Sequence, residues 1–270
     1  VTALAGLLYA YLSRQTASDK AVRALLPHRP QSLGERVLLG FSLMVLLLCC
    51  LLPLVAVVFL AASAGGSWGV LLERETLAAG WNTLRFSGMA VLTAVVLGVM
   101  YAAVARRVAW VRSLVFLPFM VSPVCIAAGI LLLYPQWTAS LPLLVVTYAL
   151  LAYPFVAKDV LAAWDDLPED YVSAARGMGA NAFQTTLYVT APLLKPALRR
   201  GLTLAAATCI GEFAATLFLS RPEWQTLTTL IYSYLGRAGE DNYARAMVLT
   251  TVLMLLSLMV FLLLDEREKT

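Results

Sequence analysis

The chain has 270 residues, of which 61% are hydrophobic and only 13% are charged, and its mean hydropathy is +0.80. Soluble domains carry roughly 25% charged residues, so this composition excludes an ordinary soluble protein. The net charge of +4 follows from the distribution of basic residues between loops, described below. We therefore expect no nucleic-acid partner.

Apolar runs of about 20 residues recur along the chain, and that length crosses a ~30 Å hydrocarbon layer as a helix. They predict an all-α, polytopic membrane protein in contact with membrane lipid. Six spans are expected, at residues 37–62, 83–104, 113–134, 141–157, 201–219 and 246–264.

The two ends of the chain complete the predicted organisation. Val1 to Leu12 is apolar but too short to span, so we interpret it as the end of a preceding span. The charged stretch that follows is expected to be a cytoplasmic linker. The predicted regions are thus the preceding span and linker at 1–36, a six-span domain at 37–264 and a cytoplasmic tail at 265–270.

Lysine and arginine are distributed unequally between alternate loops. The loops that include residues 158–200 and the C-terminal tail hold fifteen of these residues, and the other set holds five. Because cytoplasmic loops are enriched in Lys and Arg, the long polar loop and the C-terminus are predicted to be cytoplasmic. The family resemblance described below implies a bacterial inner membrane as the location.

The long polar loop has the signals of two short helices. Acidic residues and Pro168 precede Tyr171 to Arg176, which is typical of a helix start, and glycine follows at positions 177 and 179. A second helical stretch is expected from Asn181 toward Pro192. A helix, a glycine turn and a helix would suit docking into a partner protein, while an ordinary polar connection remains the alternative.

The same loop resembles the EAA loop of permease subunits of binding-protein-dependent ATP-binding-cassette (ABC) importers. The shared positions are Ala174, Ala175, Gly179 and Pro192, whereas Ser173, Val189 and Ala191 replace the family's Glu, Ile and Leu. The resemblance implies a coupling helix at about 169–179 that docks in a groove of a cytoplasmic ATPase. The implied docking residues are Glu169, Asp170, Ser173, Ala174, Ala175, Arg176, Gly179 and Pro192.

A second stretch, Gly211 to Leu217 with Arg221-Pro-Glu, resembles permeases of the ferric iron, thiamine and sulfate import group. In the iron and thiamine members of this group one chain often holds two six-span halves, so the sequence is interpreted as the C-terminal half of a fused permease or as one copy of two. The resemblance implies an extracytoplasmic solute-binding protein and a second permease half. It favours thiamine or ferric iron as solute over sulfate or another small anion. No cofactor is expected on this chain, because the ATP would be used by the partner subunit.

Glu212 lies in the middle of an expected span, where a carboxylate is costly and marks a candidate functional site. It could attract a cationic solute, or it could pack against another span with a hydrogen bond to Thr208 or Thr216. Ser122 and Tyr153, each followed by a proline, are further pathway candidates, with a simple packing kink as the alternative. The candidate pathway set is therefore Glu212, Thr208, Ser122 and Tyr153.

Two other classes of protein were weighed. An intramembrane enzyme is disfavoured, because the sequence has a single histidine, His28, and no metal-protease motif, and it has no phosphate-binding glycine loop. No metal site is expected, and the four cysteines are interpreted as small packing residues. A gradient-driven secondary transporter usually carries more than one ionisable group at membrane depth, and it should tolerate changes in the loop at 165–196.

Overall fold

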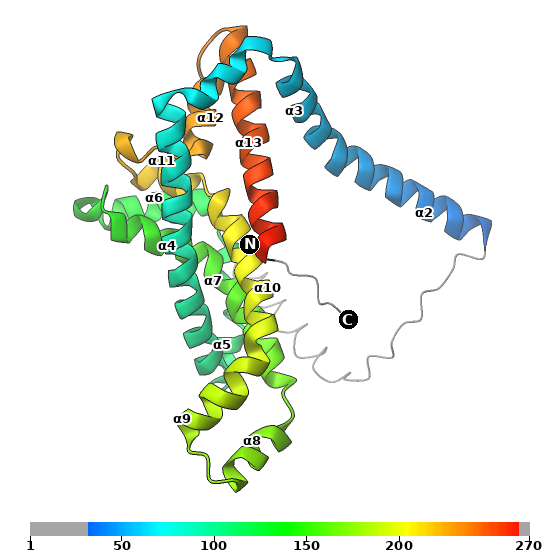
Figure 1. Ribbon diagram of the computed structural model, residues 1–270, viewed down its shortest axis with the longest axis vertical. Helices are drawn as coiled ribbons and strands as arrows, with labels where there is room; N and C mark the ends of the chain where they lie inside the picture. Colours follow the sequence, from blue (N-terminus) through cyan, green and yellow to red (C-terminus); the bar gives the residue numbers. More distant parts are fainter. Residues whose placement is uncertain (1–31, 265–270) are drawn as a thin grey trace.

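The computed structural model describes residues 32–264, and these residues form helices joined by short connections (Figure 1). The predicted preceding span, most of the linker with His28, and the C-terminal tail lie outside the described residues. The division into the three predicted regions therefore remains a prediction.

The described elements follow one another in helical segments. In chain order they are α2 (Leu33–Leu46), a π-helical turn η1 (Leu47–Leu51), α3 (Leu52–Ser63), η2 (Gly65–Leu72), α4 (Arg74–Ala105), α5 (Ala109–Arg112), η3 (Leu117–Met120), α6 (Pro123–Leu133), η4 (Pro135–Trp137), α7 (Leu141–Asp165), α8 (Glu169–Gly177), α9 (Ala182–Thr185), η5 (Thr186–Thr190), α10 (Ala191–Ile210), α11 (Ala214–Leu219), η6 (Pro222–Trp224), α12 (Leu227–Leu235) and α13 (Glu240–Leu264).

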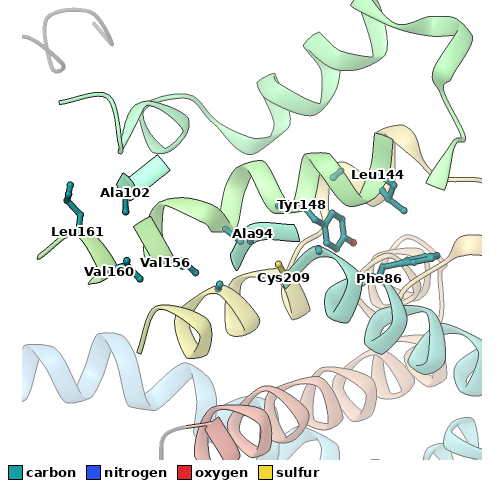
Figure 2. Packing of buried hydrophobic residues seen from close by; sticks show 14 of the residues in the cluster. Phe86, Ala94, Ala102, Leu144, Tyr148, Val156, Val160, Leu161 and Cys209 are labelled. Atoms are coloured by element: carbon teal, nitrogen blue, oxygen red, sulfur yellow. The ribbon is translucent and has the colours of Figure 1, made fainter. Parts of the chain in front are cut away.

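Helices α4, α7 and α10 pack against one another and form the centre of the bundle (Figures 1 and 2). Helix α4 presents small residues at every fourth position, Ala90, Ala94, Gly98 and Ala102, and all of them are buried. Small residues at this spacing let helix backbones approach closely in a membrane, where close packing replaces the hydrophobic effect. Larger side chains such as Tyr148 of α7 fill the remaining core.

A second core lies at the end of the molecule opposite α8 (Figure 1). It joins Val70 of η2, Leu230 of α12 and Leu249 of α13 with Ala61 of α3. The adjacent η6 segment is tied to α4, because Asn82 Nδ2 donates hydrogen bonds to the carbonyl oxygens of residues 223 and 225, each at 3.0 Å. This end is therefore fixed by both apolar packing and polar side chains.

Helix α2 slants away from the bundle, and none of its residues is buried within this chain (Figure 1). Its continuation α3 packs against α13 near the end that carries η2. Together the segment Leu33–Ser63 is apolar along its length. The exposed apolar surface therefore faces either lipid or another polypeptide.

The expected spans are only partly continuous helices. Among residues 32–264, four helical segments are long and apolar enough to cross a membrane, namely Leu33–Ser63, Arg74–Ala105, Leu141–Asp165 and Glu240–Leu264. The prediction of continuous helical spans at 113–134 and 201–219 is wrong, because both segments are interrupted. In the first, a regular helix begins only at Pro123, because proline cannot continue a preceding helix; in the second, α10 ends before Gly211 and α11 restarts at Ala214.

Two other helices, α4 and α7, are longer than the predicted spans. Residues 74–81, which precede the expected span at 83–104, form the first turns of α4, where Thr76 and Ala79 are buried. Helix α7 continues past Pro154 to Asp165 and so includes the first residues of the expected polar loop. Burial on neighbouring helices overrides the local polarity that suggested an end.

Candidate functional site

Helix α8 has the charge pattern of a well-terminated surface helix. Pro168 precedes its first turn, which holds Glu169 and Asp170, and Arg176 lies in its last turn. Acids at the amino end and a base at the carboxyl end complement the helix dipole. The structure thus confirms the predicted helix start, with α8 covering Glu169–Gly177.

The end of α8 is a glycine-dependent turn. Gly179 has φ of +89°, in the left-handed region that favours glycine. The amide of Ala180 donates to the carbonyl of Ala175 at 3.1 Å, and the amide of Gly179 donates to the carbonyl of Arg176 at 2.9 Å. This pattern reverses the chain between α8 and α9 and satisfies carbonyls that the helix end would otherwise leave unpaired.

The second half of the loop starts with a capping box. The Asn181 side chain accepts from the Gln184 amide at 2.8 Å, and the Gln184 side chain accepts from the Asn181 amide at 2.9 Å. From there α9 and η5 continue directly into α10, with Pro192 in the first turn of α10. Figure 1 shows α8 and α9 as the part of the molecule that projects furthest at the end opposite α12.

The structure brings the predicted docking residues together on this projection, and all but one of them are exposed. Ala175 is buried, and α8 packs on α9 and η5. The exposed members of the set are Glu169, Asp170, Ser173, Ala174, Arg176, Gly179 and Pro192. Polar and small side chains thus remain available on an anchored helix.

Large apolar side chains on the same projection were missed by the sequence reasoning. Tyr171, Met178 and Phe183 are 55%, 84% and 73% exposed, respectively. Exposed large apolar residues on a projecting loop are candidates for an interaction surface. The available sequence signal was the position of Met178 between two glycines at a turn, where no core could bury it.

Glu212 occupies the break between α10 and α11 and is only 8% exposed. One of its carboxylate oxygens, Oε1, accepts from the amide of Ala215 at 3.1 Å, so the side chain caps α11. Its backbone carbonyl accepts from the hydroxyls of Thr228 at 3.0 Å and Tyr148 at 3.4 Å. Hydrogen bonds from α12 and α7 therefore both stabilise the break between α10 and α11.

The alternative partners expected for Glu212 were wrong. The Thr208 hydroxyl donates to the carbonyl of Leu204 within its own helix at 2.9 Å. The hydroxyl of Thr216 pairs with that of Tyr148. Both threonine hydroxyls therefore bond to other groups, and the Glu212 carboxylate accepts from the backbone amide of Ala215 instead.

The two proline-linked pathway candidates lie in different surroundings. Ser122 is exposed and precedes α6, while the Tyr153 ring of α7 lies 5.5 Å from the Tyr101 ring of α4. Within residues 32–264, no hydrogen bond joins either of them to Glu212. The candidate pathway set thus does not form one hydrogen-bonded cluster in this chain.

No group of three or more His, Cys, Asp or Glu side chains suited to a metal occurs in the part of the chain that the structure describes. The interpretation of the cysteines as packing residues holds for Cys209, which is buried. Cys49, Cys50 and Cys125 are exposed in this chain, so for them the interpretation stays a prediction.

Curated relatives resemble the chain over most of its length. The sulfate transport system permease protein CysT of Escherichia coli (strain K12) is 28% identical over 250 residues, 84% of this chain and 90% of that protein. The putative 2-aminoethylphosphonate transport system permease protein PhnV of Salmonella typhimurium is 26% identical, covering 78% of each chain. A probable molybdenum ABC transporter permease protein of Haloferax volcanii is 32% identical, over 77% of this chain and 82% of that protein.

Solved structures share the fold at lower identity. A chain of a bacterial alginate ABC transporter, solved with a periplasmic protein that holds an alginate pentasaccharide, matches with a TM-score of 0.68 at 18% identity. That match covers 85% of this chain and 92% of the other. A chain of the inward-facing MetNI methionine ABC transporter matches with a TM-score of 0.58 at 20% identity, over 70% of this chain and 92% of the other.

The family profile described as "Binding-protein-dependent transport system inner membrane component" matches residues 91–265, well over half of the chain. The matched region contains α8, the glycine turn and the break at Glu212. Together with the four helices of the described region that are long and apolar enough to cross a membrane, and with the fold shared with ABC transporter chains, this match identifies the chain as a member of the family of inner membrane permease components of binding-protein-dependent transport systems.

Proposed function

We propose that the chain forms part of the solute pathway of an ATP-driven importer and couples to a cytoplasmic ATPase through the loop at 165–196. The observation that carries this proposal is the α8–α9 projection, which is rigidly terminated at Gly179 and exposes most of the expected docking residues. A loop that only connected two spans would not need this construction.

The surface of the projection supports docking into a groove. Its exposed apolar residues, Tyr171, Met178 and Phe183, supply area that association would remove from water. Glu169 and Asp170 beside them supply charge for orientation. Ser173 replaces the family's glutamate, so the apolar residues carry more of the contact in this chain.

The ATPase is assigned to a separate subunit. No phosphate-binding glycine loop of the Gly-x-x-x-x-Gly-Lys-Ser/Thr type occurs in the sequence. ATP would therefore bind the partner, and closure of the partner would move α8. Two arrangements of the bundle, opening to opposite sides of the membrane, would be biased by that movement.

The charge distribution supports the orientation. Because loops rich in Lys and Arg remain in the cytoplasm, we assign α8, α9 and the C-terminus to that side of the inner membrane. The opposite end, which holds η2, η6 and α12, would then meet an extracytoplasmic solute-binding protein. These assignments place the two partners at opposite ends of the bundle.

A second permease half completes the proposed transporter. Helix α2 has no buried residue in this chain, and its apolar surface extends beyond the bundle. That surface would pack on the second half or contact lipid. The second half is proposed to be another copy of this chain or a preceding part of a fused permease.

Two classes of solute are proposed. The resemblance of the segment from Gly211 to Leu217 favours thiamine or ferric iron. The names of the relatives, sulfate, 2-aminoethylphosphonate and molybdenum permeases, favour a small oxyanion and lend no support to thiamine or iron. An ATP-dependent uptake panel of thiamine, ferric iron, sulfate, molybdate and 2-aminoethylphosphonate distinguishes the classes.

The experiment that tests the function reconstitutes the complete permease with its ATPase and solute-binding protein in liposomes. Uptake should require ATP and persist when ionophores collapse the proton and sodium gradients. A carrier driven by an ion gradient would show the reverse, with uptake that ionophores abolish and that is independent of ATP.

A further inference from the structure

The end of α7 is attached to the end of α4 by two arginines. The Arg112 guanidinium pairs with the Asp165 carboxylate, the last residue of α7. The guanidinium carbon of Arg106 lies 4.9 Å from the centre of the Trp164 ring, in cation–π geometry. Consecutive residues of α7, Trp164 and Asp165, are thus held by Arg106 at the end of α4 and by Arg112 at the end of α5.

The same segment is also attached to α4 from its other side. The Tyr101 hydroxyl of α4 donates to the carbonyl of Val111, the residue before Arg112. The Tyr101 ring in turn lies 5.5 Å from the Tyr153 ring of α7. Residues 106–112 therefore form a bracket, the connecting segment that joins the ends of α4 and α7.

The position of this bracket matters because α8 begins at Glu169, four residues after Asp165. Helix α8 itself packs on α9 and η5. A force applied to α8 can therefore reach the bundle by two routes. One runs forward through η5 into α10, and the other runs back through residues 166–168 to the bracketed end of α7.

The ion pair between Arg112 and Asp165 is too exposed to add much to the stability of the fold. The side chains of Arg112 and Asp165 are 53% and 24% exposed. Ion pairs with this degree of exposure contribute little to folding. The geometric consequence of the bracket contacts is larger, because they fix the last turn of α7, which lies beyond its last buried residue, Leu161, to the segment that follows α4.

We propose that Arg106 and Arg112 are positioning residues that make the ends of α4 and α7 move as one body when the ATPase displaces α8. This inference rests on the proposed docking of an ATPase to α8. It assigns the arginines a role in passing movement to the spans, with no direct contact to solute or nucleotide.

The test uses the complete permease with its ATPase in liposomes. The variants are Arg106→Gln, Arg112→Gln and the charge exchange Arg112→Asp with Asp165→Arg. The matched control is Arg107→Gln, because Arg107 lies between the two arginines, is exposed, and makes no ion pair or ring contact within residues 32–264. Spin labels at Val104 and Ala162, both exposed, report the distance between the ends of α4 and α7.

In the native protein and in Arg107→Gln, the label distance should stay the same on trapping with ATP and vanadate. In Arg106→Gln and Arg112→Gln, the ATPase should remain bound and hydrolyse ATP, but the label distance should change on trapping. Uptake per ATP of whichever panel solute the native complex accumulates should fall by about 2- to 30-fold, the range for contacts that carry coupling. The charge exchange should restore the fixed distance.

Two results are kept separate. If the variants keep the native label distance during trapping, or if the charge exchange restores nothing, the positioning role is overturned while the docking proposal stands. If the native complex retains no ATPase, the proposed function itself fails, and the inference fails with it.

Discussion

Gly201 of α10 and Val156 of α7 lie in direct backbone contact. A Cβ at position 201 would lie 2.7 Å from the Cα of Val156 and 3.1 Å from the carbonyl oxygen of Phe155. On the other side of the same residue, a Cβ at Gly98 of α4 would lie 2.7 Å from the Cβ of Val156. Val156 is therefore enclosed between two glycines, which sets the spacing of all three central helices.

Gly201→Ala should destabilise the protein, because the added methyl group meets backbone atoms that cannot rotate away. Overpacking of this kind costs about 1–3 kcal/mol. Gly88→Ala in α4 is the control, since a Cβ there has no atom within 4 Å. Thermal unfolding of the purified permease in detergent measures the difference, and equal melting temperatures for the two variants would contradict the close approach.

Gly179→Ala should weaken the coupling loop through backbone strain. A non-glycine residue in the left-handed region costs about 1–2 kcal/mol, and Gly179 has φ of +89°. Gly177→Ala provides the control, because Gly177 ends α8 without a left-handed backbone and a Cβ has open space at both positions. The affinity of the permease for its ATPase, measured by titration in detergent, should fall for residue 179 and stay near native for residue 177.

Glu212→Ala should loosen the break between α10 and α11, because the capping bond to the Ala215 amide is lost. Loss of a helix cap costs about 0.5–2 kcal/mol, which thermal unfolding can detect. Glu212→Gln keeps an acceptor oxygen and should unfold close to the native temperature. If Glu212→Gln instead raised the KM for a cationic solute without altering stability, the carboxylate would belong to the solute pathway.

Glu73 should stabilise the end of the bundle opposite α8 by joining three helices. Its carboxylate accepts from Arg245 of α13 at 2.6 Å and from the Tyr234 hydroxyl of α12 at 3.1 Å. Glu73→Gln should lower the unfolding free energy by about 0.5–1.5 kcal/mol, and the difference should shrink in high salt. The control is Glu75→Gln. Glu75 lies two residues further along the chain and makes no hydrogen bond among the described residues, so this change should alter the unfolding free energy little.

The helix, glycine turn and helix of the loop at 165–196 could be predicted from the sequence because their signals are local. Acids in the first turn of α8, the glycine after it and Asn181 before α9 each act within a few residues through dipole, backbone and capping effects. The all-helical membrane fold followed from apolar run length for the same reason. These features do not depend on which other helices lie nearby.

The breaks within the expected spans could not be predicted from local signals. Whether Gly211 interrupts a helix depends on partners that compensate the freed backbone, and these are Tyr148 of α7 and Thr228 of α12. The function of the small residues between Ala90 and Ala102 likewise becomes clear only from the packing of Val156 against Gly98. Both features arise from contacts between segments that are distant in the sequence.

The central claim is that α8 and its glycine turn dock an ATPase, and co-purification tests it most directly. The chain, in its complete gene context, is purified by affinity with the ATPase encoded nearest to it, as native protein, Gly179→Trp and Gly177→Trp. We expect the native protein to retain the ATPase and Gly179→Trp to lose it, with Gly177→Trp showing how much of the loss is due to bulk alone. If the native protein retained no ATPase in several mild detergents, the account would be contradicted and a gradient-driven carrier would be favoured.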